Sequence, residues 1–273
     1  MSFIDDLHQR WFKHNTLICV GFDPDLARIP AHFGQGKDAI LAWGKTIVDQ
    51  TADLCCAYKP QIAHFAALGA EDVLLDLIRY IKEVAPQVPV ILDSKRGDIG
   101  TTAERYAVEA FERFQADAVT INPYLGVDSI APFTSYRDKG VIVLCRTTNP
   151  SAVELQNMRL ENGRTLYQQV AYQAAGEWNE HGNLGLVVGA TWPKEMSEIR
   201  AIVGDMPFLV PGLGAQGGDA AEVMKRGKTA DGAGLIISSS RAIIFASQGE
   251  DFAESVRQAT LDLQQQISSL RAL

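Results

Sequence analysis

A closed barrel of eight parallel strands, each followed by a helix, is the fold that this sequence predicts. Eight short apolar runs alternate with segments whose apolar residues recur at the helical period. The strand-like runs are apolar throughout rather than alternating, which is typical of parallel strands covered by helices. Eight such units fit an α/β (β/α)8 barrel, or TIM barrel, better than an open doubly wound sheet, and 273 residues is a common size for one.

The expected strands follow one another at intervals that leave room for a helix. They cover residues 17–23, 54–59, 88–93, 118–122, 141–146, 185–190, 208–212 and 235–239. Helical periodicity is clearest over residues 39–49, 73–84, 102–114 and 163–181, and a last helix over 251–270 is expected to close the outer ring. No Pro-, Gly- or Ser-rich linker and no repeat divides the chain, so we expect a single barrel domain over residues 1–273.

The bulk composition indicates a globular protein with 47% hydrophobic residues, which is enough for a large core. A net charge of −8 argues against nucleic acid or an anionic membrane as the main partner, although it permits an anionic small molecule at a locally positive site. No run is long enough to span a membrane, and the acidic first residues do not resemble a signal peptide. The four cysteines lie in apolar runs, which favours reduced core residues in a cytoplasmic protein: Cys19, Cys55, Cys56 and Cys145.

We expect the chemistry in the stretch from residue 90 to residue 102. A β-branched run leads into Asp93, and Lys95 lies two residues further on, so both side chains point to one face if the strand continues. Asp98 follows in a loop that can fold back toward Lys95. An ordinary surface ion pair in a solvated loop is the alternative, and such a pair contributes little on its own.

A helix is expected directly after this loop. Thr101 and Glu104 have the spacing of a capping box, in which the threonine side chain accepts a hydrogen bond from the helix start. Thr102 would then lie in the first turn, close to the charged residues.

Polar residues recur where the expected strands end. Active sites of (β/α)8 barrels lie at the carboxyl ends of their strands, so a shared position at this rim is a stronger signal than any one of these residues. Besides Asp93 and Lys95, the rim would hold Asp23, Lys59, Asn122, the segment 146–149 and Arg241.

The glycine-rich stretch 211–219 follows the seventh expected strand. Its spacing formally matches a dinucleotide-binding fingerprint, but such a fingerprint belongs after the first strand of an open sheet. Loops after strands 7 and 8 of a barrel commonly bind phosphate through backbone N–H groups. Arg241, just past strand 8, would add a permanently charged partner. A glycine-rich turn that serves only the connection is the alternative.

Metal and nucleophile chemistry find little support in the sequence. The five histidines are scattered and none pairs at ligand spacing, so no metal site is expected. His64, between apolar residues, is interpreted as a packed or surface histidine rather than a catalyst. No Gly-x-Ser-x-Gly elbow is present.

The segment 93–102 resembles the signature of the orotidine 5′-phosphate decarboxylase family, Asp-x-Lys-x-x-Asp-[Ile/Val]-x-x-Thr. The resemblance extends over most of the chain and is closest to the longer bacterial members. It implies a barrel fold and cofactor-independent decarboxylation of orotidine 5′-monophosphate to uridine 5′-monophosphate in de novo pyrimidine biosynthesis. It also implies a homodimer with shared active sites.

The same resemblance implies a role for each matching residue. Asp93, Lys95 and Asp98 would form the catalytic charged array, which Lys59 supports, with Lys95 stabilising the carbanion at C6 and protonating it. The substrate-binding residues would be Asp23 and Thr102 for the ribose (Thr102 from the neighbouring subunit), Thr148 for the pyrimidine, and Gln216 and Arg241 for the phosphate. Ser240 stands where many relatives have glycine, and the segment 151–164 has no counterpart in shorter relatives.

Two other functions are weighed against this one. A related sugar-phosphate decarboxylase or synthase shares the Asp-x-Lys-x-x-Asp motif, but such relatives use Mg²⁺ held partly by an acid at the end of strand 2, where this chain has Lys59. A non-catalytic phosphate-binding barrel is the second, although an array of charges without a function would only cost stability.

Overall fold

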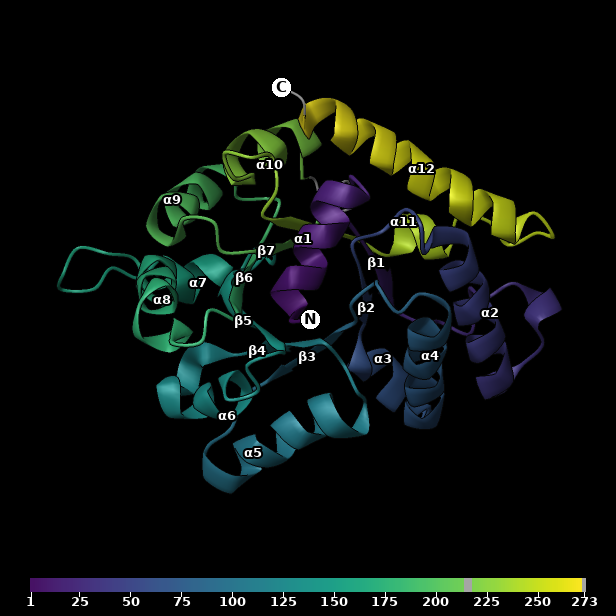
Figure 1. Cartoon of the computed structure of the whole chain (residues 1–273), viewed down its shortest axis with the longest axis horizontal. Coiled ribbons are helices and arrows are strands. Elements are labelled where there is room, and N and C mark those ends of the chain that lie inside the picture. Colours follow the sequence, from purple (N-terminus) through teal and green to yellow (C-terminus); the bar gives the residue numbers. More distant parts are fainter. Residues whose placement is uncertain (214–217, 272–273) are drawn as a thin grey trace.

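The structure, a computed structural model, describes residues 1–213 and 218–271. In this part of the chain eight parallel strands form one sheet that curls into a barrel, with helices around its outside (Figure 1). The expected (β/α)8 barrel is therefore confirmed, and strand bounds differ from expectation by at most three residues. The strands are β1 (Ile18–Phe22), β2 (Ala57–Pro60), β3 (Ile91–Arg96), β4 (Ala118–Ile121), β5 (Gly140–Arg146), β6 (Leu184–Val188), β7 (Phe208–Val210) and β8 (Leu235–Ser239).

The strand order is β2-β1-β8-β7-β6-β5-β4-β3, so β2 and β3 are the two ends of the sheet. Two parallel bridges join these ends and close the barrel, one between Tyr58 and Val90 and one between Gln61 and Asp93. The second bridge lies at the carboxyl ends of both strands. Closure therefore brings the end of β2 next to the charged segment of β3.

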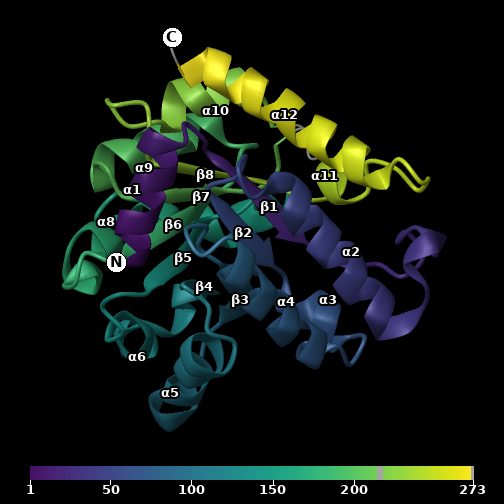
Figure 2. The same ribbon diagram turned by 45° about the vertical axis from the view of Figure 1, so that its right-hand side comes forward.

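Helices cover the barrel on all sides, as the continuous apolar character of the strands requires. The long C-terminal helix α12 lies against α2 and α10 and completes the outer ring, as expected (Figure 2). The helices are α1 (Phe3–Lys13), α2 (Gly36–Thr51), α3 (Ile62–Ala66), α4 (Glu71–Val84), α5 (Gly100–Val108), α6 (Ala131–Thr134), α7 (Ala152–Gln156), α8 (Leu166–Ala175), α9 (Pro193–Val203), α10 (Ala220–Gly227), α11 (Arg241–Ile244) and α12 (Phe252–Arg271). No helix in residues 1–213 and 218–271 has the length and apolar character of a membrane span.

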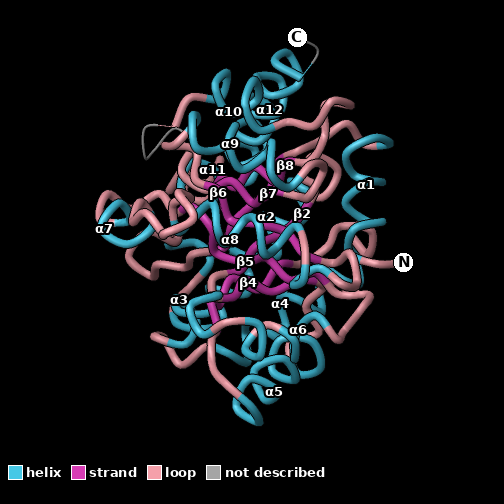
Figure 3. Tube along the Cα trace, turned by 90° about the vertical axis from the view of Figure 1, so that its left-hand side faces the viewer, coloured by secondary structure: helices cyan, strands magenta, loops and turns pink. Residues whose placement is uncertain are grey.

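Helix α1 seals the amino-terminal end of the barrel. The Phe3 N–H donates to the carbonyl of Asp138, just before β5, and the buried Arg10 side chain donates to the carbonyl of Cys55, just before β2. In Figure 3, α1 and α7 lie on opposite sides of the strands. The carboxyl ends, which face away from α1, are therefore the end at which a site can open.

Two local features differ from the sequence analysis. Helix α1 was not among the expected helices, although Ser2 and Asp5 form a capping box at its start. The capping box expected at residues 101 to 104 was wrong. Helix α5 begins at Gly100, with Ile99 as an N-cap that makes no side-chain hydrogen bond. Gly100 adopts a φ of 53°, which turns the chain into the helix one residue early and leaves Thr101 within the first turn.

The contact between α1 and β5 gives a stability prediction. A Cβ atom at Gly140 would overlap the ring of Phe3. We expect Gly140→Ala to lower the free energy of unfolding by about 1–3 kcal/mol, the usual cost of overpacking. In a Phe3→Ala background the ring is gone, so the same change should cost little. Urea unfolding of the two single variants and the double variant measures this, and equal costs in both backgrounds would contradict the proposed overlap.

Candidate active site

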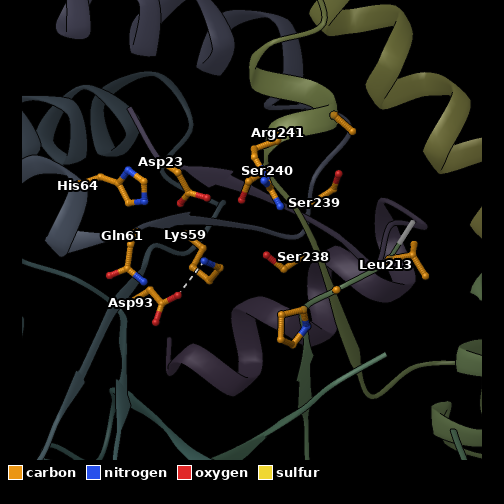
Figure 4. A pocket seen from close by; sticks show the side chains of 13 residues that line it. Asp23, Lys59, Gln61, His64, Asp93, Leu213, Ser238, Ser239, Ser240 and Arg241 are labelled. Atoms are coloured by element: carbon orange, nitrogen blue, oxygen red, sulfur yellow. Dashed lines mark hydrogen bonds and ion pairs between the residues drawn. The ribbon is translucent and has the colours of Figure 1, made fainter. Parts of the chain in front are cut away.

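A cavity of about 210 Å³ opens at the carboxyl ends of the strands, as the sequence analysis expects. Four of the expected site residues line it: Asp23 after β1, Lys59 on β2, Asp93 on β3 and Arg241 at the start of α11. In Figure 4, Asp93 and Arg241 lie on opposite sides of this space. The cavity thus has one side with an ion pair and a separate cationic side.

Asp93 is the centre of the charged side. Its Oδ2 accepts a hydrogen bond from Lys59 Nζ at 2.8 Å, drawn as a dashed line in Figure 4, and its Oδ1 accepts one from Lys95 Nζ at 2.6 Å. The side chains of Lys59 and Asp93 are each 8% exposed, whereas that of Lys95 is 44% exposed. Lys59 is therefore a buried support, while the Lys95 ammonium is accessible to a ligand.

Thr120 on β4 fixes the position of Asp93 and of the chain after it. Its hydroxyl donates to Asp93 Oδ1 at 2.8 Å and accepts the backbone N–H groups of Ser94 and Lys95, each at 3.0 Å. These bonds hold a β-bulge, because three residues of β3 between Leu92 and Arg96 stand opposite the single residue Thr120 of β4.

The bulge gives Lys95 a φ of 49°, in the left-handed region. A non-glycine residue pays about 1–2 kcal/mol for this conformation. Asp93 and Lys95 do meet, as expected, but the bulge brings them together rather than the simple alternation of a regular strand. The strain is stored at the one residue of the array that is open to a ligand.

Electrostatics keep Lys59 and Asp93 ionised. Burial disfavours the Lys59 ammonium, but the carboxylates of Asp93 and Asp23 outweigh it and raise the pKa of Lys59 above its ordinary value. Burial likewise disfavours the Asp93 carboxylate, but Lys59 and Lys95 outweigh it and lower the pKa of Asp93. Asp93 is thus a carboxylate at neutral pH. Asp93 can therefore hold the Lys95 ammonium in place. The ammonium can in turn stabilise negative charge on a ligand or donate a proton to it.

The opposite side of the cavity combines Arg241 with backbone and hydroxyl groups. Ser238, Ser239 and Ser240 lead from β8 into Arg241, which is exposed at the start of α11. Ser240 has a φ of −115°, which needs no glycine, and its hydroxyl lies directly over Gly21, where any side chain would overlap it. A cation beside hydroxyl groups suits a phosphate. Gln216, expected here, lies outside the described residues.

Four expected site residues do not line the cavity within one chain, and one of them is Lys95, which reaches it only through its bond to Asp93. Asp98 is half-buried, and its carboxylate accepts the N–H of Ile99 rather than reaching Lys95. Thr102 is exposed on α5. Thr148 lies against Gly189 after β6, where an added Cβ would be 2.6 Å from the Thr148 methyl group. The described chain therefore assembles part of the expected site in the cavity, whereas Asp98, Thr102 and Thr148 follow the carboxyl ends of β3 and β5.

Other residues of the site were missed by the sequence analysis. Gln61 and Ser238 line the cavity, and Thr120 holds Asp93. Gln61 follows Lys59 by two residues, so strand alternation alone could have placed it on the same face. His64 is exposed at the cavity, with Nδ1 3.3 Å from the carbonyl oxygen of Pro24. His64 is thus a surface rather than a packed residue, but its place on the cavity was not expected from the sequence.

The Asp93 cluster gives a second prediction. Asp93→Asn should lower the free energy of unfolding by about 3–5 kcal/mol at neutral pH, because it leaves the buried Lys59 ammonium without its carboxylate. The pKa of Asp93 is lowered from an ordinary value of 3.8, so its stabilisation is present above that value and is lost as the pH falls toward the folded-state pKa.

The difference between wild type and Asp93→Asn should therefore be constant around neutrality and shrink below about pH 4. Urea unfolding over a pH series measures it. Asp72→Asn, which breaks the exposed pair with Lys37, is the matched control and should change little. A gap as large in acid as at neutral pH would contradict the assignment.

Comparison with known proteins agrees with this geometry. The family described as "Orotidine 5'-phosphate decarboxylase / HUMPS family" matches residues 16–256. A Cellvibrio japonicus (strain Ueda107) protein named orotidine 5'-phosphate decarboxylase is 58% identical, with 100% of both chains covered. A Dechloromonas aromatica (strain RCB) protein of the same name is 56% identical over 99% of this chain and 100% of its own. The solved structure of Leishmania donovani OMP decarboxylase has a TM-score of 0.87 at 38% identity, with both chains fully covered. The chain therefore belongs to the orotidine 5'-phosphate decarboxylase / HUMPS family.

Proposed function

We propose that this protein is an orotidine-5′-phosphate decarboxylase, a carboxy-lyase that converts orotidine 5′-monophosphate to uridine 5′-monophosphate in pyrimidine biosynthesis. The observation that carries the proposal is the Lys59–Asp93 ion pair, which lines a cavity with Arg241 on its other side and holds Lys95 beside it. Relatives that match the whole chain are named for this activity. One nucleotide then spans the cavity, with its phosphate at Arg241 and its base at Lys95.

Lys95 has two roles in the proposed reaction. Breaking the bond between C6 and the carboxylate releases CO₂ and leaves an electron pair in the plane of the ring, where no carbonyl group can delocalise it. The Lys95 ammonium stabilises that pair and then transfers a proton to C6. Lys95 is left neutral and regains a proton from water. Asp93 holds the Lys95 ammonium in place until that transfer.

Binding of the remote phosphate supplies energy for the step at C6. We assign the phosphate to Arg241 and Gln216, the ribose to Asp23 and Thr102, and the pyrimidine to Thr148. Of these residues, Asp23 and Arg241 are supported by their place on the cavity. Asp98 is assigned to the charged array, where its carboxylate disfavours the substrate's own carboxylate before reaction.

We expect no metal ion or organic cofactor in the reaction. The sugar-phosphate relatives need Mg²⁺ near the end of β2, and here the Lys59 ammonium occupies that place, bonded to Asp93. A cation there repels a metal ion. A non-catalytic phosphate-binding barrel is disfavoured for a different reason, since it gains nothing from a strained, accessible Lys95.

We also propose a homodimer in which each site takes Asp98 and Thr102 from the other subunit. Neither residue lines the cavity of its own chain. Around them the rim exposes large apolar side chains, with Ile99 56%, Tyr124 76% and Val127 49% exposed. Such a patch beside an incomplete site is typical of an interface. A two-fold axis would make the exchange of residues reciprocal.

The remaining expectations are a single domain and a cytoplasmic location. The four cysteines are free and buried, which supports a reducing compartment. The acidic net charge supports a small nucleotide substrate rather than nucleic acid as the partner.

Loss of the ultraviolet absorbance of orotidine 5′-monophosphate is the direct test of the activity. We expect turnover by the purified protein, and the same turnover after dialysis against a chelator. Turnover that requires added Mg²⁺, or no turnover with a fully folded protein, would contradict the proposal.

Changing Lys95→Ala should reduce kcat by about 10³-fold or more, because the stabilising cation and the proton donor are lost together. Binding of uridine 5′-monophosphate should persist, since the contacts on the Arg241 side remain. Steady-state kinetics and calorimetric titration measure the two effects. Lys37→Ala removes an exposed lysine and is the control. A Lys95 variant with a tenth of the normal kcat would show that another group donates the proton.

The shared site predicts complementation between two inactive variants. Lys95→Ala and Asp98→Ala homodimers should each be nearly inactive, whereas random exchange makes about half the dimers hybrids, each with one intact site. Roughly a quarter of wild-type activity should then return. The measurement is activity after co-refolding, with hybrid dimers identified by mass. Hybrids without activity would place both residues in one subunit's site.

A further inference from the structure

The segment 151–164, to which the sequence analysis assigns no role, is ordered and attached to α8. It contains α7 and a hairpin in which the Leu160 N–H donates to Arg164 and the Leu166 N–H donates to Met158. The hairpin runs directly into the capping box of α8. The last residue of α7, Gln156, points back to the end of β5.

Gln156 makes three hydrogen bonds to two consecutive residues of the loop after β5. Its Oε1 accepts from Arg146 Nη1 and from the backbone N–H of Thr147, both at 3.0 Å. Its Nε2 donates to the Thr147 hydroxyl at 2.8 Å. A single amide side chain therefore connects the inserted segment to the residue that precedes Thr148.

Thr147 is held from both sides. The Trp192 indole donates to its carbonyl at 2.8 Å, and its own hydroxyl donates to Asn149 Oδ1 at 2.7 Å. With Gln156 bonded to its N–H, all the polar groups of Thr147 are occupied. Trp192 comes from the start of α9 and Gln156 from α7, so the loop is fixed between two separate elements.

The buried guanidinium of Arg146 depends on Gln156 for a hydrogen-bond acceptor. The Arg146 side chain is fully buried, with the guanidinium 3.7 Å from the centre of the Trp192 ring. Within residues 1–213 and 218–271, its Nε and Nη2 atoms have no hydrogen-bond partner and Gln156 is the acceptor for Nη1. Loss of that acceptor leaves a buried guanidinium without a side-chain partner, which is costly, so the loop would shift to solvate it.

Thr148 is the residue that such a shift would displace. It packs against the bare backbone of Gly189, and an added Cβ there would be 3.2 Å from the Thr148 Cα and N atoms. This contact and the bonds to Thr147 together fix the position of Thr148, so release of Thr147 removes one of its two restraints.

We propose that Gln156 is a positioning residue, through which the segment 151–164 fixes Thr148 for recognition of the pyrimidine. This inference rests on the proposed function and on the pyrimidine contact assigned to Thr148. The segment then sets how tightly the base is bound, without touching the substrate. Lys95, on β3, keeps its own support from Asp93 and Thr120.

The test compares the affinity of the intact protein for two ligands, one with a base and one without. The comparison separates recognition of the base from recognition of the sugar phosphate. Gln156→Ala should weaken binding of uridine 5′-monophosphate about tenfold, the scale of losing hydrogen bonds to a buried charged group. Binding of ribose 5-phosphate, which has no base, should be unchanged. The KM for orotidine 5′-monophosphate should rise by a similar factor, with kcat little altered.

Two further variants are matched to this one. Gln156→Glu keeps an acceptor for Arg146 and for the Thr147 N–H, so its affinity for uridine 5′-monophosphate should return close to wild type. Glu154→Ala changes an exposed residue of the same helix and should have no effect. Calorimetric titration gives all the affinities.

The outcomes distinguish this inference from the proposed function. A wild-type protein without decarboxylase activity would reject the proposed function itself. With an active wild type, the inference is overturned if Gln156→Ala binds uridine 5′-monophosphate normally or loses ribose 5-phosphate equally. It is also overturned if Thr148→Ala leaves affinity for uridine 5′-monophosphate unchanged.

Discussion

One carboxylate between two ammonium groups organises the active end of this barrel. Asp93 is buried, and its charge is offset by Lys59 and Lys95, each of which bonds one of its oxygens. Lys59 has no other described acceptor and depends on Asp93 in turn. The pair from β2 and β3 also lies where the two ends of the sheet meet, next to the bridge between Gln61 and Asp93. The contact between β2 and β3 that closes the barrel thus also brings Lys59 and Asp93 together as an ion pair.

The two charged groups of the cavity, the array on β3 and Arg241, lie on opposite sides of it. In the proposed reaction the array on β3 acts on the reacting carbon, whereas Arg241 and the serines after β8 suit the phosphate (Figure 4). Each group is carried by the end of a different strand, and the rigid barrel sets the distance between them. Substrate binding therefore needs little rearrangement of the strands.

The global fold followed from the sequence because burial on both faces demands apolar strands, and eight such runs were visible. The positions of Asp93, Lys59 and Arg241 followed from where those runs ended. The bulge at Lys95 did not, because it depends on the Thr120 hydroxyl, which arrives from a separate strand. The capping box at Thr101 failed since Gly100 turned the chain earlier than a local pattern could show. Gln156 was missed for the same reason as Thr120, since its partners are set by tertiary contact.

The left-handed backbone at Lys95 has an evolutionary consequence. Glycine adopts that conformation freely, so the backbone at this position would relax if the lysine were lost, while Lys59 continued to neutralise Asp93. Selection for folding alone thus gives no protection to this residue. A gene copy released from its metabolic duty would be expected to lose the lysine early and keep the barrel, becoming an inert but well-folded descendant.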